Sequence, residues 1–248
     1  MAGKAEFRKY GNRGAYHWDA FSRSIRRHNP YLAGRYRLVL ELLECAKLPG
    51  RRLLDIGCGD GALSYLMTMA GWDVTGLDYS PTGLGFARDK FMEEGAAASF
   101  MRGDSCMLPV KDGSLDAVVA ADIIEHLTEQ EAFLSEIARV LKPGGAAVIT
   151  TPVKVTEIPV DPEHVREFYP EEFRETLGRY FGSVEIIQSH PADCVARYNR
   201  QYRFLGVVGR MKPYKYIYNV MSSYVGNNPF LGSGGGGYTQ MSAICRKR

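Results

Sequence analysis

The chain has 248 residues, of which 45% are hydrophobic and 24% charged, and its formal net charge is +3. This length favours one domain with added segments, and the composition is that of a folded globular protein, which excludes a disordered or fibrous chain. No stretch approaches the roughly 20 apolar residues of a membrane-spanning helix. The polar N-terminus does not have the apolar core of a secretory signal, and the five cysteines form no C-x-x-C pair. We therefore expect a cytoplasmic protein without structural disulfides.

The near-neutral net charge conceals a strong segregation along the chain. Residues 1–50 contain ten Lys or Arg and four Asp or Glu, whereas residues 51–193 contain 12 basic and 24 acidic residues. Residues 194–248 contain nine basic residues and no acidic one. Either the basic ends pack against the acidic centre and neutralise it, or they face a ligand that the centre does not bind.

The first predicted elements alternate between apolar runs and helical periods. Runs at residues 52–56, 73–77, 98–101, 115–120 and 146–151 predict five strands, with amphipathic helices between them. Ser80 before Pro81 predicts the start of one helix, and Thr128 with Glu131 predicts a capping box for another. Strands that alternate with helices in this way form βαβ units around a parallel sheet.

The C-terminal part continues this pattern and then departs from it. We predict a helix over 170–181, a sixth strand over 183–188 and a seventh over 238–245. The last two strands are separated by about fifty residues that include the glycine-rich stretch 232–237, which predicts a flexible loop. The sequence therefore predicts one doubly wound α/β domain with additions at both ends.

A glycine-rich turn follows the first strand and precedes a helix. Residues 57–61 read Gly-Cys-Gly-Asp-Gly, a composition that lets a ligand approach the backbone and the free N–H groups of a helix start. Asp55 precedes this turn, Asp78 ends the second strand, and Asp104 follows the third. Carboxylates at three consecutive strand ends suit a ligand with hydroxyls, an amine and positive charge better than they suit a dinucleotide, which makes a Rossmann dehydrogenase the least favoured reading.

Four motifs, LLDIGCGDG, GLDYS, GDSCMLP and LKPGG, occur in this order over residues 50–152. As a set they resemble the class I S-adenosylmethionine-dependent methyltransferases. That resemblance implies a Rossmann-like doubly wound sheet of seven strands with the last strand antiparallel. It also implies S-adenosyl-L-methionine as cofactor and S-adenosyl-L-homocysteine as product. The residues it assigns to the cofactor are Asp55, Gly57, Cys58 and Gly59 at the methionine end, Asp78 at the ribose, Tyr79, Asp104 and Ser105 at the adenine, and Asp122 near the transferable methyl.

The fourth strand is followed by Asp122-Ile-Ile-Glu125-His126, at the edge where open α/β sheets bind ligands. His126 is the natural general base for a hydroxyl acceptor, and we place Glu125 and His164 with it in the catalytic group. Alternatively, Glu125 and His126 only anchor the loop. The pattern also resembles two branches of the family, the ubiquinone-biosynthesis O-methyltransferases and the small-RNA 3′-terminal 2′-O-methyltransferases. In the latter the matching positions, here Asp122, Glu125, His126 and His164, hold a divalent cation. A metal is therefore an alternative, but a metal-free histidine pair is the prediction.

The two ends suggest substrate-facing additions. We assign 1–248 to a single methyltransferase domain, with an N-terminal helical cap at 1–48, a cofactor-binding core at 50–152 and a lid or insertion at 190–237. Tyr16, His17 and Trp18 either close on the cofactor or anchor a helix to the sheet. Residues 195–230 interleave basic and aromatic side chains, which fits a lid over an acidic substrate, a peripheral contact with a membrane, or single-stranded nucleic acid. Of these, the lid is favoured and nucleic acid is the least favoured.

These observations together predict a methyltransferase acting on an oxygen, with nitrogen second, of a small-molecule acceptor that is acidic or lipid-like. The alternative within the same chemistry is a metal-assisted O-methyltransferase acting on a quinone precursor or an RNA terminus. The alternative from another class is a scaffold that binds the cofactor without catalysis.

Overall fold

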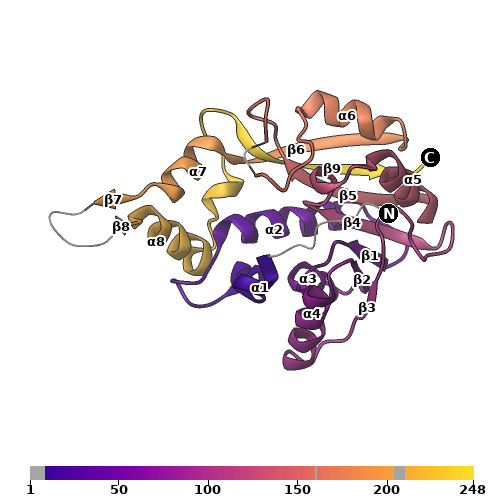
Figure 1. Cartoon of the computed structure of the whole chain (residues 1–248), viewed down its shortest axis with the longest axis horizontal. Coiled ribbons are helices and arrows are strands. Elements are labelled where there is room, and N and C mark those ends of the chain that lie inside the picture. Colours follow the sequence, from indigo (N-terminus) through magenta and orange to yellow (C-terminus); the bar gives the residue numbers. More distant parts are fainter. Residues whose placement is uncertain (1–8, 160, 204–209) are drawn as a thin grey trace.

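A mixed sheet of seven strands forms the centre of the molecule, with helices on both of its faces (Figure 1). The computed structural model describes residues 9–159, 161–203 and 210–248. The strands of the sheet are β1 (Arg52–Ile56), β2 (Asp73–Asp78), β3 (Ser99–Arg102), β4 (Leu115–Ala121), β5 (Leu141–Pro152), β6 (Ser183–Pro191) and β9 (Tyr238–Arg246). The α-helices are α1 (Lys9–Arg13), α2 (Pro30–Cys45), α3 (Ala62–Met69), α4 (Pro81–Glu93), α5 (Gln130–Val140), α6 (Pro170–Gly178), α7 (Ala192–Asn199) and α8 (Pro213–Val220).

The strand order is β3-β2-β1-β4-β5-β9-β6. The first five strands pair in parallel, whereas β9 pairs antiparallel with both β5 and β6. This confirms the predicted doubly wound sheet of seven strands with an antiparallel last strand. The chain winds from β1 to β2 on one side and continues with β4 on the other, so the end of β1 lies at a topological switch point, where such sheets bind ligands.

Both faces of the sheet are buried, which explains the nearly continuous apolar runs of the central strands. Successive residues of β1 belong to different cores: Leu53 packs with Val39 and Leu43 of α2, and Leu54 packs in the core that contains Phe133 of α5. The period-2 alternation of a strand therefore supplies two cores at once.

Local signals at the helix starts are partly confirmed. The Ser80 hydroxyl accepts a hydrogen bond from the N–H of Gly83 at 3.2 Å, as the predicted N-cap requires. The capping box at Thr128 is wrong, because the N–H of Phe133 donates to the carbonyl of Glu129 and the N-cap residue of α5 is Glu129. The helix predicted over 170–181 ends at Gly178, and the fifth strand begins at Leu141 rather than at residue 146.

Additional elements lie before β1 and between β6 and β9. The 3₁₀ turn η1 (Tyr16–Phe21) joins α1 to α2, and the insertion contains α7, the strand pair β7 (Tyr202–Arg203) and β8 (Arg210–Met211), α8, the π-helical turn η3 (Met221–Val225) and the 3₁₀ turn η4 (Pro229–Leu231). The insertion lies against the N-terminal half of α2, where Phe230 contacts Tyr31 (Figure 1). Residues 204–209 of the predicted basic and aromatic segment fall outside the described residues. Among the helices that are described, none combines the length and apolarity needed to cross a membrane.

Candidate functional site

The glycine turn between β1 and α3 lies at the switch point of the sheet. Gly57, Gly59 and Gly61 all have positive φ values (74°, 54° and 76°), which residues with a Cβ rarely adopt. The N–H groups of Gly57 and Cys58 donate to the carbonyl of Leu77 at 2.7 and 3.1 Å, so the turn is tied to β2. Burial raises the pKa of the Cys58 thiol well above its usual range, which argues against a nucleophilic role for this cysteine.

Two of the predicted carboxylates flank this turn. Asp55, at the end of β1, is buried and accepts a hydrogen bond from the Ser64 hydroxyl at 2.5 Å. Burial raises the pKa of Asp55 to about 7. Asp78, at the end of β2, accepts from the N–H of Gly59 at 2.8 Å and from the N–H of Ser80 at 2.7 Å, and burial raises its pKa as well. Asp78 therefore joins the glycine turn to the start of α4.

The third carboxylate belongs to a neighbouring turn after β3. Asp104 accepts from the N–H of Cys106 at 2.9 Å, and Ser105 beside it is buried. The ring of Tyr79 is half exposed and lies beneath the Arg102 guanidinium, 5.1 Å from ring centre to Cζ. The ends of β1, β2 and β3 thus place the predicted cofactor residues along one edge of the sheet, since these strands are direct neighbours.

The N-terminal segment covers the glycine turn. A Cβ at Gly59 would overlap the Tyr10 hydroxyl, so the phenol of Tyr10 occupies the space that this glycine leaves open. The N–H of His17 donates to the Asp60 carboxylate at 3.0 Å, and the Trp18 indole donates to the Asp60 carbonyl at 2.8 Å. Trp18 therefore anchors η1 to the turn. Tyr10 was not among the sequence predictions, because nothing in its neighbourhood along the chain indicates a contact 49 residues away.

A second group of functional side chains lies after β4. Glu125, His126 and His164 each place one ligand atom within 4.8 Å of the others. The two imidazole rings meet edge to face, with their centres 4.9 Å apart. The Nδ1 of His126 donates to the Glu163 carbonyl at 2.9 Å, and the Nδ1 of His164 lies 2.7 Å from a carboxylate oxygen of Glu167. The fold thus brings together the three residues of the predicted catalytic group, although they are 39 positions apart in the chain.

Glu125 is the most buried member of this group. It is fully buried, the Thr151 hydroxyl donates to its Oε2 at 3.1 Å, and its Oε1 has no hydrogen-bond partner within the described part of the chain. Burial raises the pKa of Glu125 to about 7. The Glu125 carbonyl accepts from the N–H groups of Val165 and Arg166, so the turn after β4 and the loop that contains His164 are held together by the backbone.

Asp122 lies apart from this cluster. It has a φ of +52°, accepts a hydrogen bond from the Thr150 hydroxyl at 2.6 Å, and forms an ion pair with Arg35 of α2. Three of the four candidate metal ligands, Glu125, His126 and His164, therefore lie together, whereas the fourth, Asp122, is paired with a cation. Arg35 was missed by the sequence analysis, since an arginine in an amphipathic helix is ordinarily an exposed residue.

The two groups share one edge of the sheet. A Cβ at Gly57 would lie 2.9 Å from the Cδ1 of Ile123, which places the turn after β4 against the glycine turn. Glycine N–H groups and carboxylates thus adjoin a pair of histidines and a buried glutamic acid, an arrangement that can bind a polar ligand on one side and move a proton on the other.

The part of the chain that forms this edge of the sheet is similar to known proteins. Residues 54–149 match the family model described as a methyltransferase domain. A probable S-adenosylmethionine-dependent methyltransferase of Mycolicibacterium smegmatis is 34% identical over 154 residues, which are 59% of this chain and 57% of that protein. A ubiquinone biosynthesis O-methyltransferase of Dechloromonas aromatica is 32% identical over 154 residues, covering 60% of this chain and 63% of that protein. The chain thus spans rather more than half the length of these relatives.

A solved structure has the same fold over the whole length of the chain. The phosphoethanolamine N-methyltransferase 2 of Haemonchus contortus, in complex with phosphomonomethylethanolamine and S-adenosylhomocysteine, superposes with a TM-score of 0.67. The alignment covers 100% of this chain and 60% of that one at 18% sequence identity, so it bears on the fold alone.

Proposed function

We propose that this chain is a class I S-adenosylmethionine-dependent methyltransferase, since residues 54–149 match a methyltransferase domain, and that it methylates an oxygen, with nitrogen second, of a small-molecule acceptor. The observation that carries the proposal is the shared edge, where the glycine turn and Asp78 adjoin the Glu125, His126 and His164 cluster. The similarity to the ubiquinone biosynthesis O-methyltransferase of D. aromatica supports oxygen as the target.

The residues around the glycine turn fit the cofactor. S-adenosylmethionine supplies, when bound, an electrophilic methyl group on a positively charged sulfonium. Three positive-φ glycines provide a backbone that a ligand can approach closely, and Asp78 presents a carboxylate suited to ribose hydroxyls. Asp55 supplies a buried acidic group beside the turn, and Asp104 and Ser105 provide polar groups for the adenine edge. A ligand that reaches the Gly59 backbone takes the place of the Tyr10 phenol, so this side chain has to move when the site fills.

The chemistry then depends on positioning and on one proton. Holding the acceptor in line with the methyl group contributes about 7–11 kcal/mol to such a reaction. His126 receives the proton of an acceptor hydroxyl, and Glu163 fixes its tautomer because the Glu163 carbonyl accepts from Nδ1 and leaves Nε2 as the basic nitrogen. His164 orients the His126 ring through their edge-to-face contact. The Glu125 carbonyl holds the turn after β4 and the loop of His164 together through its backbone hydrogen bonds.

Two variants separate binding from chemistry. Asp78→Asn removes the charge that holds Gly59 and Ser80, and it should weaken calorimetric binding of S-adenosylmethionine and S-adenosylhomocysteine. His126→Ala should leave this binding intact and lower turnover by roughly 10²–10⁴-fold on a hydroxyl acceptor. Binding of NAD(H) in place of the adenosyl ligands would refute the proposal. Binding without turnover on any acceptor, in a panel of hydroxylated and amine compounds, would favour the scaffold alternative.

A metal-assisted reaction is the second candidate. It is favoured by the Oε1 of Glu125, which lies beside two histidines and has no hydrogen-bond partner among the described residues. Oxygen and nitrogen ligands of this kind suit Mg²⁺, Mn²⁺ or Zn²⁺. We expect the histidine pair to act without metal, so dialysis against EDTA should leave turnover unchanged. Loss of turnover that Mg²⁺, Mn²⁺ or Zn²⁺ restores would establish the metal-assisted alternative, and quinone precursors and RNA termini would then be the acceptors to test.

A further inference from the structure

Two segments that are distant in the sequence form one continuous surface beside the N-terminal end of α2. The hydroxyl of Tyr224 donates to the Arg23 carbonyl at 3.1 Å, and the side-chain amide of Asn219 donates to the Ile25 carbonyl at 2.5 Å. The Nε2 of His28 lies 3.0 Å from the Ser222 hydroxyl. We call residues 22–28 and 212–225 together the basic apolar face. These contacts fix its two halves relative to each other.

The face exposes apolar side chains where a monomer would ordinarily place polar ones. In α8, Tyr218 and Asn219 point inward and are buried, while Tyr216, Ile217 and Val220 are exposed. The π-helical turn η3 adds Tyr224 and Val225, which are 65% and 68% exposed. Exposed large apolar residues that adjoin one another on one element indicate an interaction site.

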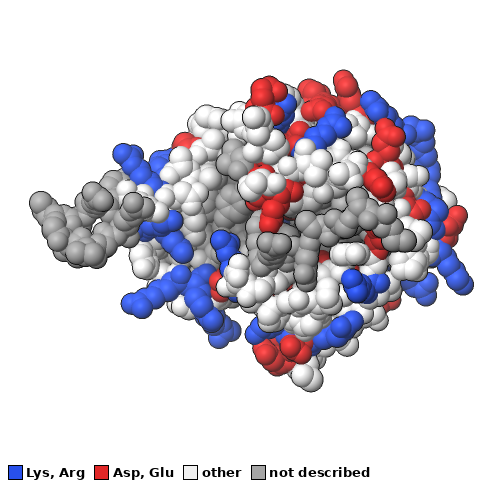
Figure 2. Space-filling model, viewed as in Figure 1, with Lys and Arg blue, Asp and Glu red and all other residues white. Residues whose placement is uncertain are grey.

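Cations surround these apolar side chains. Arg23, Arg26 and Arg27 are exposed on the loop before α2, and Lys212 and Lys215 flank the start of α8. Burial raises the pKa of Asp19, and the nearby charges of Arg27 and Lys215 act in the opposite direction. The space-filling view shows basic side chains gathered over this end of the molecule (Figure 2). The face is thus apolar at its centre and positively charged around it.

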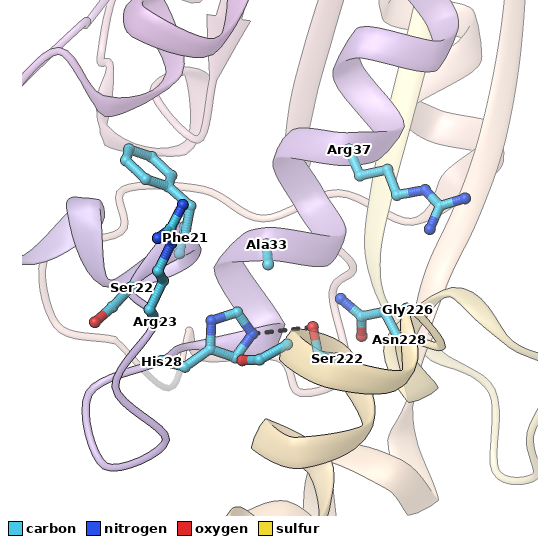
Figure 3. A pocket seen from close by; sticks show the side chains of 11 residues that line it. Phe21, Ser22, Arg23, His28, Ala33, Arg37, Ser222, Gly226 and Asn228 are labelled. Atoms are coloured by element: carbon cyan, nitrogen blue, oxygen red, sulfur yellow. Dashed lines mark hydrogen bonds between the residues drawn. The ribbon is translucent and has the colours of Figure 1, made fainter. Parts of the chain in front are cut away.

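A cavity of about 330 Å³ opens between α2 and η3 within this surface. Arg23, Arg37, Ser222 and Ser223 contribute to its lining, together with the buried ring of His28 (Figure 3). None of the described residues that line it is acidic. Burial lowers the pKa of His28, and the Arg37 guanidinium is paired with the Glu41 carboxylate at 2.8 Å. The other polar groups of the lining include the Arg23 guanidinium, the Ser222 and Ser223 hydroxyls and the Asn228 amide. This composition suits a phosphate ester.

We propose that the basic apolar face binds the surface of an anionic lipid bilayer, with a lipid phosphate in this cavity. Exposed aliphatic and tyrosine side chains enter the boundary between headgroups and acyl chains, and the surrounding arginines and lysines contact anionic headgroups. A second copy of the chain would place like charges against one another, and nucleic acid would leave the aliphatic Ile217, Val220 and Val225 without a partner.

A second exposed apolar region shows the opposite charge and so provides an internal contrast. Val155 and Ile158 are exposed on the loop before α6, but Glu157, Asp161 and Glu163 lie in the same loop. An anionic bilayer would repel this loop, so a change at Ile158 serves as a matched control for a change at Ile217.

Co-sedimentation with vesicles tests the proposal. The full chain should bind vesicles of phosphatidylcholine with 30% phosphatidylglycerol, and binding should weaken in 0.5 M NaCl because the exposed charges are screened. Arg26→Gln with Arg27→Gln should lower the partition coefficient about 30-fold, since each basic residue near such a surface contributes about fivefold. Ile217→Asp with Val225→Asp should abolish binding. Two variants serve as controls: Ile158→Asp, and the double change Arg174→Gln with Arg179→Gln. Both should bind the vesicles as strongly as the unmodified chain does.

Circular dichroism and calorimetric binding of S-adenosylhomocysteine establish that each variant is folded. Equal binding to pure phosphatidylcholine, or binding to neither vesicle, would overturn the proposal. A dimer in light scattering that dissociates on the Ile217 and Val225 changes would also overturn it. So would binding of a single-stranded RNA that the Arg26 and Arg27 changes abolish. These outcomes are independent of turnover, and therefore of the proposed reaction.

Discussion

Replacement of Asp55 by asparagine tests the electrostatics at the end of β1. Burial raises the pKa of Asp55 from its ordinary 3.8 to about 7, so the folded chain retains a proton that the unfolded chain releases. Below about pH 4 both states are protonated, and the carboxyl adds nothing to the pH dependence of stability. As the pH rises from about 4 to about 7, the free energy of unfolding falls by about 1.4 kcal/mol per unit, which totals about 4 kcal/mol.

The Asp55→Asn variant does not titrate, so it should not show this loss. Between pH 5 and pH 8 the free energy of unfolding of the unmodified chain should fall by about 3 kcal/mol more than that of the variant. Urea unfolding at pH 5, 6.5 and 8 measures this difference, and equal slopes against urea would show that the unfolded states are comparable. Asp73→Asn, at an exposed position of the neighbouring strand, controls for the loss of one negative charge. Parallel pH profiles for the unmodified chain and Asp55→Asn would refute the reasoning.

Two further predictions concern the N-terminal elements. Arg35→Met should lower the free energy of unfolding by about 3–5 kcal/mol in urea titrations, because it leaves the mostly buried Asp122 carboxylate without its cation. Adding Asp122→Asn should recover part of that loss, and an additive double variant would contradict the pairing. Gly59→Ala should cost about 1–2 kcal/mol through its positive φ and displace Tyr10, which Trp18 fluorescence would report. Tyr10→Ala in the Gly59→Ala background should remove the steric overlap but not the cost of the positive φ. If the Trp18 fluorescence of Gly59→Ala equals that of the unmodified chain, α1 does not pack on this turn.

The sequence by itself determined the sheet and the glycine turn. The five apolar runs, the spacing of the helices between them and the N-cap at Ser80 depend on short windows of the chain, where periodicity and local hydrogen bonding decide the outcome. The order of Asp55, Asp78 and Asp104 followed from the same windows, because consecutive parallel strands end at one edge of a sheet. Even here a local signal failed at Thr128, where the first helical hydrogen bond formed one residue later.

Only the tertiary structure decided which distant residues meet. Arg35 pairs with Asp122 across 87 positions, Tyr10 reaches Gly59, and Tyr224 reaches the backbone of Arg23. Such contacts depend on how whole helices and strands pack against one another. The local sequence pattern does not predict them, because it is equally compatible with exposure of the same side chains to solvent. For the same reason the charge segregation of the sequence indicated a distinct role for the ends, but only the packing of α8 against residues 22–28 joined them into a single basic apolar face.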